Sequence, residues 1–151
     1  MNYFKSIFLF LFIFSFSQKS KAQAISYYPF DNAQQLSIAT NPTKVVWVDF
    51  RFQMNSFTSS LNTEAALMAN LAYTRNANFY VGGGTNMGII GAFYNRTLIN
   101  GYFGSFGVRA YPFEKAPKVS INFETGPYVD VDGKSGKFRA WLGLGYHFGG
   151  K

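Results

Sequence analysis

The chain has 151 residues, the size of one domain, with a formal net charge of +7, 20% aromatic residues and only 14% charged residues. It contains no cysteine, which excludes disulfides and thiolate metal sites. Soluble domains usually carry about 25% charged residues, so a chain this aromatic and this poor in charge is unusual among them.

Residues 1–24 have the three parts of a secretory signal peptide. Lys5 gives the N-terminal part its positive charge, and an apolar run extends from Ile7 to Phe16. Ala22-Gln-Ala24 then supplies the small residues of a cleavage site. The run is shorter than the ~20 residues of a membrane-spanning helix. We therefore expect a cleaved signal and one mature domain over 25–151. Three of the basic residues leave with the signal, which argues against a nucleic-acid partner.

The rest of the sequence offers no other segment apolar and long enough for a transmembrane helix. An exported chain that is rich in aromatics and glycine but poor in charge is typical of a transmembrane β-barrel. A closed, hydrogen-bonded barrel in lipid would also supply stability without disulfides.

The stretch 25–43 has the weakest pattern. Residues 25–30 and 36–40 could form two short strands, while Pro29 and Pro42 argue against a long central strand in either place. We expect an N-terminal hairpin here. An N-terminal plug, or an assembly of several chains, remains the alternative.

Residues 44–55 form the first clear strand, because apolar residues alternate with polar ones and a tryptophan. Residues 61–73 alternate in the same way, although the same residues are good helix formers. We favour a strand, since both neighbouring segments are strands and the connections are short.

Four more segments alternate, which brings the clear strands to six; they are 79–86, 102–111, 119–129 and 137–148. Most are long enough to cross a bilayer when tilted. If the N-terminus lies in the periplasm, the long connection 87–100 lies on the extracellular side of the membrane and the short turn 74–78 lies on the periplasmic side. Transmembrane barrels have this arrangement of long and short connections. The fold class predicted is all-β: an antiparallel up-and-down transmembrane barrel of eight strands once the hairpin is counted.

Charged residues within the strands fall on the faces expected to point inward. Charges in a narrow, poorly hydrated lumen must be paired, because desolvating a lone ion costs several kcal/mol. Equal numbers of acids and arginines therefore predict a lumen filled by ion pairs rather than a catalytic cluster. The six residues are Asp49, Arg51, Glu64, Arg109, Glu124 and Arg139.

His147 is the only histidine, so any histidine-based acid, base or metal site must use it. No serine in a nucleophile motif lies near it in sequence, and Ser105, Ser120 or Glu124 would become partners only through the strand register. The glycine-rich stretch 82–88 lacks the ending of a phosphate loop, and 130–136 lacks most ligands of a calcium loop. We therefore expect no enzyme, cofactor or metal site.

The predicted connection 87–100 is unusually apolar for a solvated loop. It either folds over the barrel mouth or presents a docking surface to an envelope protein, since exposed apolar patches often mark interaction sites. The residues concerned are Ile89, Ile90, Phe93, Tyr94, Leu98 and Ile99.

The final strand, 137–148, has an unbroken apolar face that begins and ends in aromatics. With the alternation and parity of the preceding strands, it resembles the small outer-membrane β-barrel proteins of Gram-negative bacteria. That resemblance implies an outer-membrane location in contact with lipid. It also implies recognition of the last strand by the barrel-assembly machinery, through Leu144, Tyr146 and Phe148. Many members end at the aromatic, whereas this chain continues to Lys151.

The function expected from these patterns is that of a non-enzymatic outer-membrane barrel with a structural or partner-binding role. One alternative is a secreted soluble β-barrel or sandwich that holds a lipid or other apolar ligand inside, with the apolar faces of Val46/Phe50 and Leu142/Leu144 turned inward. A second alternative is a small outer-membrane lipid-modifying enzyme.

Overall fold

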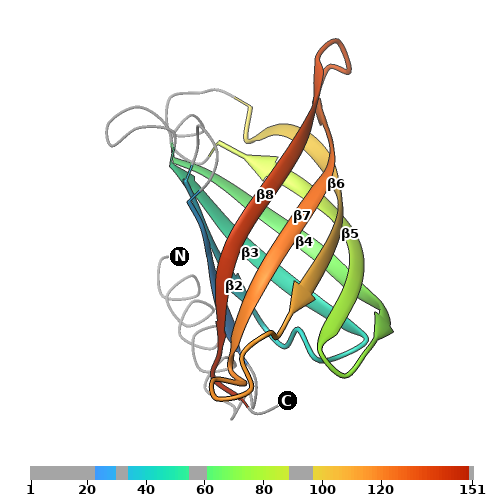
Figure 1. Ribbon diagram of the computed structural model, residues 1–151. Helices are drawn as coiled ribbons and strands as arrows, with labels where there is room; N and C mark the ends of the chain where they lie inside the picture. The colour runs from blue at the N-terminus through green and yellow to red at the C-terminus, as the bar shows by residue number, and fades with distance from the viewer. Residues whose placement is uncertain (1–22, 30–33, 55–60, 89–96, 150–151) are drawn as a thin grey trace, which may run out of the picture.

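The computed structural model describes residues 23–29, 34–54, 61–88 and 97–149, and these form a closed antiparallel β-barrel (Figure 1). The described part of the chain contains eight strands and no helix that could cross a membrane. The strands are β1 Ala24–Tyr28, β2 Gln34–Ala39, β3 Val46–Met54, β4 Leu61–Tyr73, β5 Ala77–Met87, β6 Ile99–Ala110, β7 Val119–Asp130 and β8 Gly136–His147.

Each strand pairs with the next along the chain, and β8 returns to pair with β1. The closing ladder runs from Ala24 opposite His147 to Tyr27 opposite Leu144. The six predicted strands are confirmed, including 61–73, and the N-terminal hairpin β1–β2 completes eight. The last strand thus closes against the hairpin rather than against β3.

Proline sets the limits of the hairpin strands. β1 ends at Tyr28, directly before Pro29, and β2 ends before the turn that contains Pro42. That turn folds against the barrel: the Asn70 side-chain amide donates to the carbonyl oxygens of Pro42 at 2.9 Å and Lys44 at 2.6 Å. The strands β1 and β2 are therefore short, as their sequence predicted.

The barrel is polar inside and apolar outside. Arg51 is 0% exposed, whereas Val46 on the same strand is 51% exposed and Leu144 on β8 is 59% exposed. The apolar faces therefore point away from the interior, whereas the soluble ligand-binding alternative requires them to point inward. Buried side chains of the interior include Ser37, Asp49, Gln53, Glu64, Asn122 and Glu124; large apolar side chains exposed on the wall include Ile38, Phe50, Leu67, Val81, Phe106, Phe123 and Leu142.

The start of β1 and the end of β8 lie at one end of the barrel, which we call the lower end (Figure 1). The connections 40–45, 74–76 and 111–118 also lie there, because the strands alternate in direction. The upper end carries the β7–β8 turn, which rises above the neighbouring strands in Figure 1. Gly133 in this turn has a φ of 69°, a left-handed conformation that glycine adopts without steric cost.

Candidate functional site

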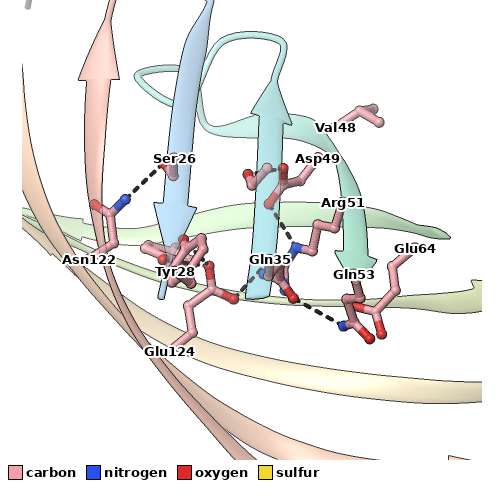
Figure 2. A network of polar contacts seen from close by, with 12 residues as sticks. Ser26, Tyr28, Gln35, Val48, Asp49, Arg51, Gln53, Glu64, Asn122 and Glu124 are labelled. Carbon is pink, nitrogen blue, oxygen red and sulfur yellow. Dashed lines mark hydrogen bonds and ion pairs between the residues drawn. The ribbon is translucent and has the colours of Figure 1, made fainter. Parts of the chain in front are cut away.

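The lower interior network is centred on the Glu124 carboxylate (Figure 2). Tyr28 of β1 and Tyr80 of β5 donate to its Oε1 at 3.0 and 2.9 Å, and Arg51 Nη2 of β3 lies 2.8 Å from its Oε2. Arg51 Nε also pairs with Asp49 Oδ2 at 2.9 Å, and Ser37 donates to Asp49 Oδ1. One guanidinium therefore bridges two buried carboxylates, and hydroxyl groups donate to one oxygen of each carboxylate.

The upper interior network is centred on the Glu64 carboxylate of β4. Arg139 Nη1 of β8 lies 2.6 Å from Glu64 Oε1, and the Asn86 amide of β5 donates to the same oxygen at 3.0 Å. Asn100 of β6 donates to Asn86 Oδ1 at 3.3 Å. These residues come from four strands, so the network ties the wall together across the interior.

The ring of Phe103, from β6, lies between these two networks. The guanidinium carbons of Arg51 and Arg139 lie over this ring, 5.6 and 4.9 Å from its centroid. Arg139 also lies 4.8 Å from the ring centroid of Tyr128. Cation–π contacts of this kind stabilise a guanidinium that has lost its water. The interior is therefore packed with side chains at this level.

Arg109 occupies a different environment from the other predicted network residues. Its guanidinium lies over the rings of Trp47 and Tyr80, 5.0 and 5.3 Å from their centroids, and it contacts Tyr111. Among the described residues no ion pair joins Arg109 to a carboxylate. The structure thus joins five of the six predicted charges through ion pairs and places the sixth on aromatic rings.

Inward-facing glycines make room for the tyrosines of the lower network. A Cβ at Gly107 would overlap the ring of Tyr80, and a Cβ at Gly143 would overlap the backbone oxygen of Tyr27 and the ring of Tyr28. Glycine is therefore required at these two positions by the close approach of neighbouring atoms.

A third polar cluster surrounds His147 near the lower end. His147 Nε2 lies 3.3 Å from the Tyr111 hydroxyl and 3.4 Å from Ser120 Oγ. Ser120 donates to Asn122 Oδ1 at 2.9 Å, and the Asn122 amide donates to Ser26 Oγ at 2.8 Å. Burial raises the pKa of the Tyr111 phenol, so this hydroxyl is neutral.

The strand register brings Ser120 beside His147, which spacing along the sequence could not predict. However, Ser120 is 0% exposed and its hydroxyl bonds to Asn122. A nucleophile must reach its substrate as well as its base. The cluster has the geometry of polar packing between β1, β7 and β8.

No family model, curated protein or solved structure matches this chain. Within the ranges that the structure describes, no group of three His, Cys, Asp or Glu residues is arranged to hold a metal ion.

The three residues of the predicted assembly signal share the outer face of the lower end. Leu144, Tyr146 and Phe148 are exposed, and the rings of Tyr146 and Phe148 meet edge to face with centroids 5.3 Å apart. The backbone N–H of Phe148 donates to the carbonyl of Gln23 at 2.8 Å. The aromatic end of β8 is thus held against the start of β1.

The upper connection between β5 and β6 is shorter than predicted, because Met87 and Ile99 pair within the two strands. Gly88 N–H donates to the Leu98 carbonyl at 3.0 Å, and the Leu98 side chain is exposed. The other members of the predicted docking surface, Ile89, Ile90, Phe93 and Tyr94, lie outside the described residues.

Proposed function

We propose that this protein is a non-enzymatic integral barrel of the bacterial outer membrane, with a structural or partner-binding role and a lumen closed by buried ion pairs. The observation that carries the proposal is the inverted distribution of polarity: charges are buried and large apolar side chains cover the wall. Exposing such an apolar surface to water costs free energy, whereas contact with lipid acyl chains is favourable.

Strand length supports the proposal. The strands β3 to β8 contain 9, 13, 11, 12, 12 and 12 residues, and a tilted strand crosses a bilayer with about 9–11 residues. Exposed aromatic side chains lie near both ends of the wall, where the girdles of membrane barrels occur. They are Tyr73, Tyr146 and Phe148 at the lower end and Tyr102 and Phe138 at the upper end.

The filled interior supports a role other than transport. The networks around Glu124 and Glu64, with Phe103 between them, occupy the space that a porin leaves to water. A structural or docking role needs no open path. Under this proposal the barrel-assembly machinery recognises the outer face of the last strand. A partner protein of the envelope binds at the upper end.

Carbonate extraction tests the membrane proposal. We expect the protein to stay in the membrane pellet in alkaline carbonate and to show a heat-dependent shift on gels, as closed barrels do. Release into the supernatant without detergent would overturn the proposal.

A matched pair of variants sharpens this test. Leu142→Arg places a charge on the apolar wall and should cost about 2–4 kcal/mol of stability in vesicles if that position lies near the bilayer midplane. Val131→Arg changes an exposed apolar residue in the β7–β8 turn and should have little effect. Equal effects of the two variants would contradict a lipid-facing wall.

A further inference from the structure

The connections at the lower end carry a net positive charge. Their basic side chains, all exposed, are Lys44, Arg75, Lys115 and Lys118, whereas Glu114 is the only acid among the described residues there. The basic side chains come from the three connections 40–45, 74–76 and 111–118. In Figure 1 the connections 40–45 and 74–76 lie at one side of the lower end and 111–118 lies at the other. The charge is therefore spread around the rim instead of being gathered on one loop.

The upper end has no such bias in its described part. The β7–β8 hairpin carries Asp130 and Asp132 together with Lys134 and Lys137, so its charges balance. The asymmetry between the two ends therefore cannot be attributed to a general excess of lysine on exposed turns.

Two of the basic residues follow an exposed aromatic residue closely in the sequence. Tyr73 ends β4 two residues before Arg75, and Phe113 precedes Lys115 by two residues. Aromatic side chains of membrane barrels mark the boundary between the apolar layer and the headgroups. A lysine or arginine just beyond that boundary can extend its charge to the level of the lipid phosphates.

We propose that this basic rim, defined as Lys44, Arg75, Lys115 and Lys118, binds the headgroups of anionic phospholipids in the leaflet at the lower end. The inference rests on the proposed function, since it requires the wall to lie in a bilayer. An acidic protein would be recognised by a compact patch on one side. A rim of separated charges that follows the edge of the apolar wall fits a ring of lipid headgroups instead.

Retention of lipid by the purified protein tests this inference. Protein purified from the membrane fraction is equilibrated in mixed micelles with equal amounts of phosphatidylglycerol and phosphatidylcholine, and the lipids it keeps are counted by native mass spectrometry. Each basic residue near an anionic surface adds on the order of fivefold to binding. We expect phosphatidylglycerol to be retained over phosphatidylcholine by at least about tenfold on that basis.

Two variants locate the preference. Lys44→Gln/Lys115→Gln/Lys118→Gln should lose most of it, and Lys134→Gln/Lys137→Gln, which removes lysines from the upper end, should keep it. Equal retention of the two lipids by the unaltered protein, or equal loss in both variants, overturns the inference while leaving the barrel in the membrane. Absence of the protein from carbonate-washed membranes would instead overturn the proposed function, and the inference with it.

Discussion

Tyr80 and Gly107 face each other across the β5–β6 ladder, and the ring of Tyr80 fills the space that a side chain at Gly107 would need. The same tyrosine donates its hydroxyl to Glu124 at 2.9 Å and packs edge to face on Trp47 with ring centroids 5.7 Å apart. Gly107 thus provides the space in which Tyr80 can donate a hydrogen bond to the buried Glu124 carboxylate. The hydrogen bonding of a buried carboxylate in this barrel therefore depends on how the side chains around it pack.

Gly107→Ala is therefore expected to destabilise the barrel by about 1–3 kcal/mol, the usual cost of forcing extra volume into a packed interior. Urea unfolding in vesicles, followed by tryptophan fluorescence, measures this change. Gly104→Ala is the matched control, because the atom nearest to a Cβ at Gly104 is Pro127 Cγ, at an ordinary contact distance of 3.6 Å. If the two variants unfold at the same urea concentration, Tyr80 does not need the space.

Arg51→Gln should be the most damaging single change among the interior arginines. It leaves the carboxylates of Asp49 and Glu124 buried without their shared cation, and breaking a buried pair in this way costs about 3–5 kcal/mol. Arg109→Gln should cost less, because aromatic rings surround that guanidinium and no carboxylate loses an ion pair. The order of the two unfolding midpoints checks this prediction, and a reversed order would contradict the network described for Arg51.

Under the proposed function, the unaltered protein should pass no large, steady currents in a planar bilayer, because the side chains of the two interior networks and Phe103 lie inside the barrel. A wide porin, incorporated in the same bilayer, provides the positive control. Removing side chains at the level of Phe103, with Phe103→Ala/Arg139→Ala, should introduce small currents. Steady currents from the unaltered protein would refute a closed lumen.

Phe148→Ala is expected to lower the amount of barrel that reaches the outer membrane in cells, if the last strand carries the assembly signal. Quantitative blotting of outer-membrane fractions measures this amount. The control is Phe138→Ala, which removes an exposed aromatic residue from the upper part of the same strand. Refolding of both purified variants in detergent separates recognition from stability. Equal amounts of the two variants in the membrane would argue against the signal.

His147→Ala should leave the lipid composition of the cell envelope unchanged while lowering stability slightly, because the histidine packs beside Tyr111 and Ser120 without an accessible nucleophile. Mass spectrometry of envelope lipids provides the measurement. A lipid modification that disappears in this variant and also in Ser120→Ala would restore the enzyme hypothesis.

Alternation of side chains was sufficient to predict most of the wall, because a period of two follows directly from strand geometry. The segment 61–73 shows its limit. Its leucines and alanines suit a helix, and pairing with β3 and β5 decides for a strand. The hairpin β1–β2 was harder to predict, since strands of 5 and 6 residues give a weak periodic signal.

Sequence patterns could not predict which side chains interact with one another inside the barrel. The faces of Glu64 and Arg139 could be predicted, yet these residues lie 75 positions apart and meet only because the barrel closes with one particular register. The same holds for Ser120 and His147, which register places side by side. Arg109 differs again, since nothing in its spacing distinguishes a cation held by rings from one held by carboxylates.

The shortness of β1 has a consequence for how the barrel opens. β8 is hydrogen-bonded to β7 from Val119 opposite Tyr146 up to Val129 opposite Gly136, but its ladder with β1 stops at Tyr27 opposite Leu144. Strand pairs held by few hydrogen bonds fray first. The seam between the first and last strands is therefore the joint at which amide hydrogen exchange should be fastest. Because that seam joins the first strand to the last, it can separate while every other strand pair stays intact.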